Sequence, residues 1–429
     1  MGKFVIKEAK SGFKFDLKAS NGEVIAVSET YSTEKACMNG VASVTLTVPA
    51  GTYAVALQVS DGTKTASAER FGAIVVLPST VYVSKTGANI PPYDTLAKAT
   101  PDLNVAFRSL TDGMTVVVDD GTYTLSKGQA LNSALTVRSL NGPEKTTLSG
   151  MAGDMPRAFV LQHAQASVSG FTFANFVNMS ANQPGEALRL AKAGAVVSNC
   201  VFRGCAANFS GGAISMTGGL LVDCLVTNCW ALTTTDRTLY GQAIQAENAD
   251  SVIERCVIRD CGLSRNSLTT YSVVSLSGGA QMRNSVVAHN RSRGEGGVRL
   301  TGASVMENCT VVDNIANASN QVAGVSAGSM ASVVNTIIWN NTNTVDEVIA
   351  EIGGDDSVFD TCCTNNPCFR RRGAPWRLSN ASPCLNAGKP LDWMDGAVDL
   401  YGNPRILYDK PDIGAVESPY SPGIMLIVR

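Results

Sequence analysis

Arginine and aromatic side chains recur beside one strand of a repeated sequence pattern, and they are suited to contact with a sugar polymer. Aromatic rings stack on sugar rings, and guanidinium groups pair with carboxylates through two hydrogen bonds. Two interpretations stay open: these are ordinary solvated loop residues, which is the preferred interpretation, or they line a shallow groove for an acidic glycan, because loops often carry function. The candidate residues are Arg189, Gln245, Arg299, Trp230, Tyr240, Arg265, Tyr271, Arg291 and Arg293.

The sequence shows no recognisable catalytic set. Glycoside hydrolysis needs paired carboxylates, and the adjacent acids Asp119-Asp120 and Asp355-Asp356 fall in predicted turns, where aspartate is common. The two histidines, His163 and His289, have no adjacent serine, cysteine or acid in a triad-like motif. We therefore assign no catalytic residue from the sequence.

No metal site and no cofactor are expected. Two histidines cannot form a multi-histidine site, and the clustered Cys362, Cys363 and Cys368 have no histidine nearby. A calcium site would need several carboxylates that recur along one face, and no such cluster recurs. Calcium is therefore not indicated.

The composition restricts the class of protein. Among 429 residues, 34 Lys and Arg balance 36 Asp and Glu to a net charge of −2, so a nucleic-acid partner is not expected. Apolar residues make up 45% and charged residues 16%, which excludes a disordered chain and leaves ample material for a core. No apolar run is long enough for a transmembrane helix, and no signal peptide is visible.

Residues 1–44 predict a small α+β module. Strand-like runs between residues 4 and 17 precede the hairpin turn signal Asn21-Gly22, and the run 24–27 follows it. We expect Ser32 to cap a helix over residues 33–39 that stops at Gly40. The module is charge-rich, and the chain that follows it is not.

This segment, GKFVIKEAKSGFKFDLKASNGEVIAVSETYSTEKACMNGVASV, resembles the YegP-like domain family, whose function is unknown. The resemblance covers the opening strand, the hairpin around KASNGEVI and the helix of YSTEKACMNG. Residues 45–78 resemble the last strands of a PKD-like or Ig-like module. We expect them to form a β-rich linker or a fragment of such a module.

The middle of the chain is a repeat. Segments such as ALRLAKAGAVVSNCVFRGC (187–205) and AIQAENADSVIERCVIRDC (243–261) recur about every 25–30 residues between 159 and 366. Each unit holds three short apolar–polar alternations, and no unit can bury its inner face alone, so the units must stack. The repeat predicts a mainly β fold, a right-handed parallel β-helix over residues 79–366 with about nine or ten coils.

Cysteines take equivalent places in successive repeats. The first predicted inward column is Cys200, Cys224, Cys256 and Cys309, with Ser285 and Thr336 in the gaps. The second is Cys205, Cys229, Cys261, Asn290, Asn314 and Asn341. Free cysteine packs as a small apolar side chain, so buried unpaired thiols are the preferred interpretation, and disulfides between coils are the alternative.

Both ends of the repeat resemble known families. VYVSKTGANIPPYDTLAKATPDLNVAFRSLTDGMTVVVDDGTYTL resembles the first coil of surface β-helix proteins of the pectate-lyase-like superfamily, in which a helix caps the core. The apolar stripe of this cap is Leu103, Ala106, Phe107 and Leu110. Residues 367–418, with DLYGNPRI and PDIGAVE, resemble the choice-of-anchor Q family, and 419–429 form a tail. These resemblances imply an extracellular or cell-surface protein with no assigned reaction.

Two functions remain open at this point. The chain is a surface or secreted β-helix that binds a polysaccharide or cell-surface glycan, or that serves a structural or adhesive role, without catalysis. Alternatively, it is a polysaccharide lyase or glycoside hydrolase that acts on an acidic polysaccharide along the strand that opens each repeat. We expect a monomer in both cases.

Overall fold

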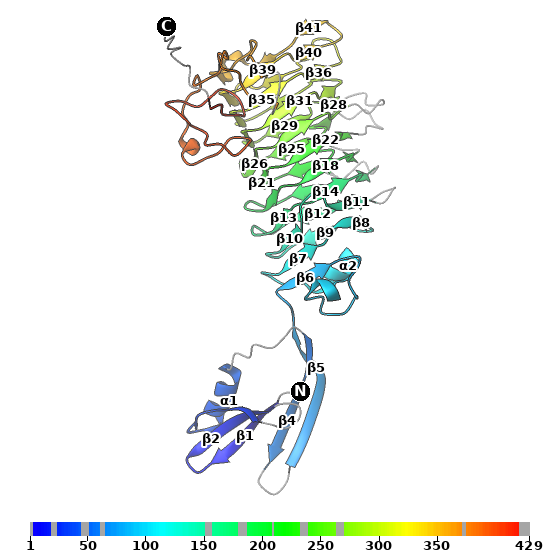
Figure 1. Ribbon diagram of the computed structural model, residues 1–429, viewed down its shortest axis with the longest axis vertical. Helices are drawn as coiled ribbons and strands as arrows, with labels where there is room; N and C mark the ends of the chain where they lie inside the picture. Colours follow the sequence, from blue (N-terminus) through cyan, green and yellow to red (C-terminus); the bar gives the residue numbers. More distant parts are fainter. Residues whose placement is uncertain are drawn as a thin grey trace, which may run out of the picture. The chain divides into compact units, whose positions relative to one another are not determined.

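The computed structural model describes residues 3–18, 24–43, 51–60, 65–150, 157–178, 187–207, 210–231, 239–262, 270–370 and 375–419. The chain divides into two compact units. One comprises Met1–Tyr82 with Thr86–Thr100, and the other Val83–Lys85 with Pro101–Arg429. The second unit contains the repeats (Figure 1).

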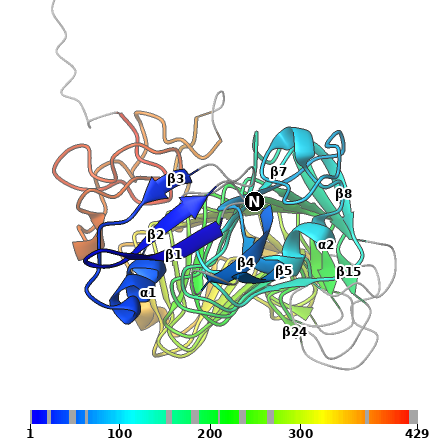
Figure 2. The same ribbon diagram turned by 90° about the horizontal axis from the view of Figure 1, so that it is seen from below.

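The first unit contains a three-stranded antiparallel sheet and one helix. β1 (Lys3–Ala9) pairs with β2 (Gly12–Lys18), which pairs with β3 (Val24–Val27). The helix α1 (Glu34–Ser43) lies against β1 and β2 (Figure 2). The unit also holds the antiparallel hairpin of β4 (Gly51–Ser60) and β5 (Thr65–Val76), then β6 (Thr80–Val83) and the short helix η1 (Leu96–Lys98).

The helix cap differs from the sequence prediction. Thr33 Oγ1, rather than Ser32, accepts a hydrogen bond from the Ala36 amide at 3.1 Å. The helix also continues past Gly40 to Ser43, because a glycine weakens a helix without ending it. The predicted Asn21-Gly22 turn lies outside the described residues.

The second unit is a parallel β-helix, as the repeat predicted (Figure 1). Its strands stack into three sheets, named here sheet 1, sheet 2 and sheet 3 in the order in which each coil visits them. Sheet 1 contains β6, β7 (Thr115–Val118), β10 (Thr136–Ser139), β13 (Ser167–Ser169), β17 (Val196–Ser198), β21 (Gly219–Val222), β26 (Ser251–Glu254), β30 (Gln281–Arg283), β34 (Val305–Glu307), β38 (Ser332–Val334) and β43 (Phe359–Asp360).

The other two sheets each contain nine strands among the described residues. Sheet 2 contains β8 (Gly121–Leu125), β11 (Thr146–Gly150), β14 (Thr172–Ala174), β18 (Val201–Arg203), β22 (Leu225–Thr227), β27 (Val257–Arg259), β31 (Val286–Ala288), β35 (Thr310–Val312) and β39 (Ile337–Trp339). Sheet 3 contains β9 (Gln129–Leu131), β12 (Phe159–Leu161), β16 (Leu188–Leu190), β20 (Ile214–Met216), β25 (Ile244–Glu247), β29 (Val274–Ser277), β33 (Val298–Leu300), β37 (Val325–Ala327) and β42 (Ile352–Gly354).

Short strands pair between sheets 2 and 3, where the coils carry their longer loops. They are β15 (Val177–Asn178), β19 (Ala206–Ala207), β23 (Trp230–Ala231), β24 (Leu239–Tyr240), β28 (Thr270–Tyr271), β32 (Arg291–Ser292), β36 (Ile315–Ala316), β40 (Thr342–Asn343) and β41 (Val348–Ile349). Most of these pairs are parallel, so they continue the stacking of the coils.

Apolar side chains form continuous inner columns. In sheet 2, Phe173 pairs in register with Phe202, and their rings stack with 4.8 Å between centroids. At the N-terminal end of the solenoid, Leu103 and Ala106 of α2 (Leu103–Ala106) are buried. The neighbouring ring of Phe107, in η2 (Phe107–Ser109), lies 5.9 Å from that of Phe159. The predicted cap therefore covers the first coils.

In each coil, a residue with positive φ directly precedes the member of each inward column. Between sheets 1 and 2 these residues are Asn199, Asp223, Arg255, Asn284, Asn308 and Asn335, with φ between 47° and 53°. Between sheet 2 and the next short strand they are Gly204, Asn228, Asp260, His289, Asp313 and Asn340. Glycine, asparagine and aspartate dominate because they tolerate the left-handed region best.

The cysteine columns are buried inside the solenoid as free thiols, which confirms the preferred interpretation. The Cys229 thiol donates to the carbonyls of Thr227 and Phe202, so one contact lies within its coil and one reaches the preceding coil. Farther along the same column, asparagine replaces cysteine. Asn314 Nδ2 donates to the Val287 carbonyl at 2.9 Å and to Asn341 Oδ1 at 2.9 Å, which makes a ladder of amides.

The outer face of sheet 2 becomes apolar where the C-terminal segment covers it. One outer column runs Arg203, Thr227, Arg259, Ala288, Val312, Trp339, and its first members are exposed or half-buried. Leu378, Cys384, Leu385, Ile413, Ala415 and Val416 pack with Val286, Val312 and Ile337 on this face. The returning segment is irregular and contains one short helix, η4 (Asp392–Met394), among its described residues.

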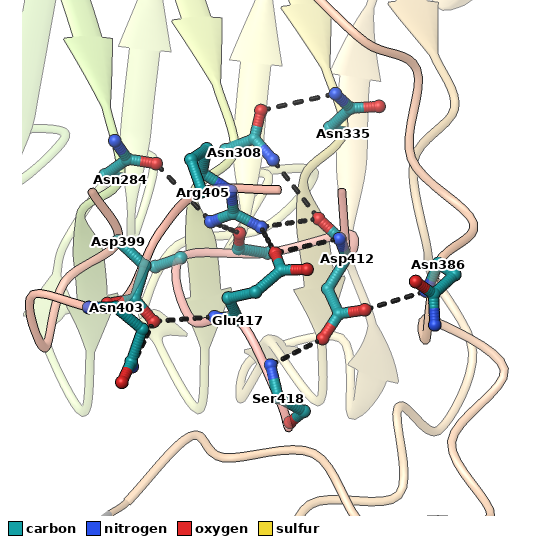
Figure 3. A network of polar contacts seen from close by, with 12 residues as sticks. Asn284, Asn308, Asn335, Asn386, Asp399, Asn403, Arg405, Asp412, Glu417 and Ser418 are labelled. Carbon is teal, nitrogen blue, oxygen red and sulfur yellow. Dashed lines mark hydrogen bonds and ion pairs between the residues drawn. The ribbon is translucent and has the colours of Figure 1, made fainter. Parts of the chain in front are cut away.

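Polar contacts join the same segment to the turn asparagines (Figure 3). Arg405 Nη2 lies 2.7 Å from Glu417 Oε2, so the DLYGNPRI and PDIGAVE sequences meet in a buried ion pair. Asn284 Nδ2 donates to the Val398 carbonyl at 3.0 Å, and Asn308 Nδ2 to the Asp412 carbonyl at 3.2 Å. These motifs therefore hold the C-terminal segment against the last coils.

Candidate functional site

The predicted polar column lies in one register on sheet 3. Its members occupy the outward position of successive strands, in the order Arg189, Ser215, Gln245, Ser275, Arg299 and Ser326. Their inward neighbours are apolar and buried, for example Ile244 beside Gln245 and Val298 beside Arg299. Strand alternation and parallel stacking together place these polar residues on one outer line.

The column is more covered than the sequence predicted. Ser215 and Ser275 are only 5% and 6% exposed, and Arg189, Gln245 and Arg299 are half-buried. An outward position on an outer strand predicts an exposed Arg299, and this prediction is wrong, because the side chain keeps only 30% of its exposure. The loops between sheets 2 and 3 bring Glu295 and Tyr240 against its guanidinium group, so a large part of the side chain is removed from solvent.

Arg299 is held between a carboxylate and an aromatic ring. Its Nη1 donates to Glu295 Oε1 at 2.6 Å, and its guanidinium carbon lies 5.0 Å from the centroid of the Tyr240 ring. Tyr240 pairs in register with Tyr271 through β24 and β28. The contacts fix the guanidinium group and offset its charge, so Arg299 orients this surface and does not act as an isolated cation.

Buried acceptors lie next to this pair. Gln242, Ser272 and Glu295 hold equivalent places in three coils, because the Gln242 amide donates to the Ser272 carbonyl and the Ser272 amide to the Glu295 carbonyl. Gln242 Nε2 donates to Ser292 Oγ at 2.7 Å. Among the described residues, Gln242 Oε1 and Glu295 Oε2 are buried without a hydrogen-bond partner, as are Ser215 Oγ and Arg189 Nε.

Sequence reasoning missed Glu295 and Gln242. Glu295 stands four residues before Arg299 in RSRGEGGVRL, but this spacing favours an ion pair only on a helix and gave no signal in a loop followed by a strand. Gln242 carried no signal either, because only the stacking of the next two coils on its own coil places it beside Ser292. Both residues belong to the loops between sheets 2 and 3.

The remaining candidates lie around the same loops. Arg291, in β32, and Arg293 are exposed, as expected, and Trp230, in β23, is half-buried. Gln245 Nε2 donates to Glu247 Oε1 at 2.8 Å on the outer face of β25. Arg265 lies outside the described residues, and the side chain of Tyr271 is likewise not described.

The acidic pairs sit in turns and have local partners. Ser84 Oγ donates to Asp119 Oδ2 at 2.8 Å, and Asn141 Nδ2 to Asp120 Oδ1 at 3.0 Å. Asp355 caps η3 (Asp356–Val358), and hydrogen bonds from Ser357 hold the pKa of its carboxyl below the usual value. His289 Nδ1 is 3.8 Å from Asp313 Oδ2 at an exposed turn. Within the described ranges, no three His, Cys, Asp or Glu residues gather as metal ligands would.

The fold defines the class of protein, a parallel β-helix with a small N-terminal module. A family model described as "Domain of unknown function (DUF1508)" matches residues 9–53. A UPF0339 protein of Treponema denticola is 51% identical over 49 residues, which cover 84% of that protein and 11% of this chain. Through this N-terminal segment the chain belongs to the UPF0339 family.

Other comparisons cover different shares of the chain. UPF0339 protein YegP of Yersinia pestis is 51% identical over 45 residues, and the chain spans 40% of the length of that protein. The crystal structure of pectate lyase Pel9A matches 79% of this chain and 96% of its own, at a TM-score of 0.43 and 14% identity. The described part of the chain contains no helix with the length and apolarity to cross a bilayer.

Proposed function

We propose that this chain is an extracellular or cell-surface β-helix that binds an acidic polysaccharide beside sheet 3, without catalysing a reaction on it. The observation that carries the proposal is the in-register polar column of sheet 3, flanked by the exposed cations Arg291 and Arg293. With coils stacked about 4.8 Å apart, the half-buried Arg189, Gln245 and Arg299 recur at every second coil along the path of a polymer that runs along the axis.

Each group has a distinct role in this proposal. Arg291 and Arg293 attract the uronic-acid carboxylates, because they are exposed and lie on one loop. Tyr240, fixed by Arg299, offers a ring for a sugar, and Glu295 holds the guanidinium group of Arg299 in place beside it. Contacts of this kind are salt-sensitive when the cations are exposed.

The test is a binding measurement on a panel of uronic-acid polymers with the double variant Arg291→Ala/Arg293→Ala. We expect at least a tenfold loss of affinity and a smaller salt dependence. The matched control is Arg203→Ala/Arg259→Ala, which removes two exposed arginines from sheet 2. Equal affinity of both variants, for a polymer that the unaltered protein binds, would refute the proposed surface.

A catalytic alternative rests on one observation, the Glu295 carboxylate that Arg299 holds beside the proposed surface with 11% of its side chain exposed. A carboxylate in this position could act as a general acid or base on a bound acidic polysaccharide, as in a lyase or glycoside hydrolase. A screen for unsaturated products and new reducing ends separates the two functions. Turnover that Glu295→Gln abolishes would establish the enzyme and overturn the non-catalytic proposal.

The division of the chain at residues 44, 78, 366 and 418 is also part of the proposal. The module 1–44 and the linker 45–78 would separate from the β-helix on limited proteolysis, because charge content and turn pattern change at this boundary. Early cleavage should fall between residues 40 and 80. Early cleavage within the repeats instead would contradict these boundaries.

A further inference from the structure

The adjacent residues Cys362 and Cys363 face opposite sides of the chain. The Cys362 thiol donates to the carbonyls of Asp360 and Val333, each at 3.5 Å, as Cys309 does to Glu307 and Met282. Cys362 therefore continues the first inward column. Because successive side chains of extended backbone alternate, Cys363 points outward.

The outward side is where the C-terminal segment packs. Cys363 lies against the hydrophobic cluster that contains Cys384, and Cys384 is fully buried in it. Both backbones are fixed. The Cys363 amide donates to the Thr336 carbonyl at 2.9 Å, and the Cys384 carbonyl accepts from the Ile413 amide at 2.9 Å. The docking of the segment therefore places both cysteines in one packed region, where the Cys363 thiol also donates to the Asn365 carbonyl at 3.3 Å.

The environments of the two sulfurs differ in a way that suits thiol exchange. A hydrogen bond from the Cys384 side chain lowers the pKa of the half-buried Cys363 to about 7. The same contact, together with burial, raises the pKa of Cys384. A thiolate is the reactive form of cysteine, so near neutral pH Cys363 is the attacking sulfur and Cys384 the resolving one.

We propose that Cys363 and Cys384 form a redox-active pair that closes to a disulfide and covalently attaches the C-terminal segment to the last coil. The oxidant is a low-molecular-weight disulfide, RS–SR. The Cys363 thiolate attacks one sulfur, forms a mixed disulfide and releases RS⁻, which takes up a proton. Cys384 then loses its proton and attacks the Cys363 sulfur, which releases the second RS⁻. The protein loses two electrons, and the oxidant becomes two thiols.

The other cysteines of the solenoid do not share this arrangement. Burial raises the pKa values of Cys205, Cys229 and Cys309, and their thiols donate to backbone carbonyls inside the coils. Buried thiols of this kind are inert in exchange. Cys368 donates to the Asn366 carbonyl at 3.7 Å. A disulfide between Cys363 and Cys368 is the competing outcome of the experiment below.

The test is thiol counting on the full chain, which contains 12 cysteines. After incubation with oxidised glutathione and denaturation, iodoacetamide should alkylate two fewer cysteines than in the reduced protein. Peptide mapping should find residue 363 linked to residue 384. Cys384→Ser should stop at a glutathione adduct on Cys363, and the control Cys362→Ser should still form the link.

Three results would overturn the pair: no loss of thiols in the unaltered protein, a link that joins Cys363 to Cys368 instead, or the same two-thiol loss in Cys363→Ser. Circular dichroism of each variant shows that its coils are folded. The outcome is independent of glycan binding, because Cys363 and Cys384 lie outside the sheet 3 surface.

Discussion

Two arginine–glutamate pairs of almost equal length lie in very different surroundings. Arg405 Nη2 is 2.7 Å from Glu417 Oε2, and neither side chain is exposed. Arg299 Nη1 is 2.6 Å from Glu295 Oε1, but Arg299 keeps 30% and Glu295 11% of its side-chain exposure. The length of an ion pair therefore says little about its role, and its burial and neighbours decide that role.

The two pairs also connect different parts of the chain. Arg405 additionally donates to the carbonyls of Asp412 and Gly414, and through Asn284 it reaches the solenoid (Figure 3). Arg299 and Glu295 belong to one loop and strand, and Glu295 Oε2 has no partner among the described residues. The first pair stabilises the docked segment, and the second arranges a surface.

The largest expected effect is that of Arg405→Met. At pH 8, where Glu417 is ionised, the substitution leaves its carboxylate buried without a cation, which costs about 3–5 kcal/mol of unfolding free energy. Urea denaturation followed by tryptophan fluorescence measures this loss, because all four tryptophans lie in the second unit. The control is Arg377→Met, whose half-buried guanidinium lies over the Tyr401 ring, and we expect it to cost less than about 1 kcal/mol. Equal losses in both variants would contradict the structural role of Arg405.

The next effect is a pH dependence from Glu417. Burial raises its pKa from 4.5 to about 7, against the opposing charge of Arg405. Between these values the folded protein holds a proton that the unfolded chain has lost, so this contribution to stability is full at low pH and is lost as pH rises to about 7. The loss is about 3 kcal/mol, since each pKa unit corresponds to about 1.4 kcal/mol.

Glu417→Gln measures this contribution directly, because the amide cannot titrate. Between pH 5 and pH 8, the urea midpoint should decrease more in the unaltered protein than in the variant. The difference between these two decreases isolates the contribution of Glu417 from those of the other titrating groups. Identical decreases would show that Glu417 keeps an ordinary pKa in the folded protein.

The smallest effect on stability is that of Arg299→Met. Its pair is partly solvated and local in sequence, so the cost is about 1 kcal/mol or less. The same urea measurement that is applied to Arg405→Met makes the comparison. A loss as large as that of Arg405→Met would contradict the difference between the two pairs. It would show that the pair of Arg299 and Glu295 also stabilises the fold.

Much of the fold was predictable because repeat patterns report on local stacking. The cysteine columns, the outward line from Arg189 to Ser326 and the cap around Leu103 all follow from alternation and equivalent positions in each coil. The YegP-like resemblance also identified the N-terminal segment that the family comparison matches. Helix ends were less predictable, as Thr33 and Gly40 show, because neighbouring caps compete on small energy differences.

The sequence by itself determined the order of the coils, the two inward columns and the outward polar line. Each of them depends on the alternation of side chains along a strand and on the repeat that recurs once per coil. Only the tertiary structure decided how far the surface is covered. The burial of Arg299 depends on where Tyr240 and Glu295 fold, and the pairing of Arg405 with Glu417 depends on a segment that returns past several coils. Contacts between loops leave no period in the sequence, because loop length and direction set them rather than strand alternation.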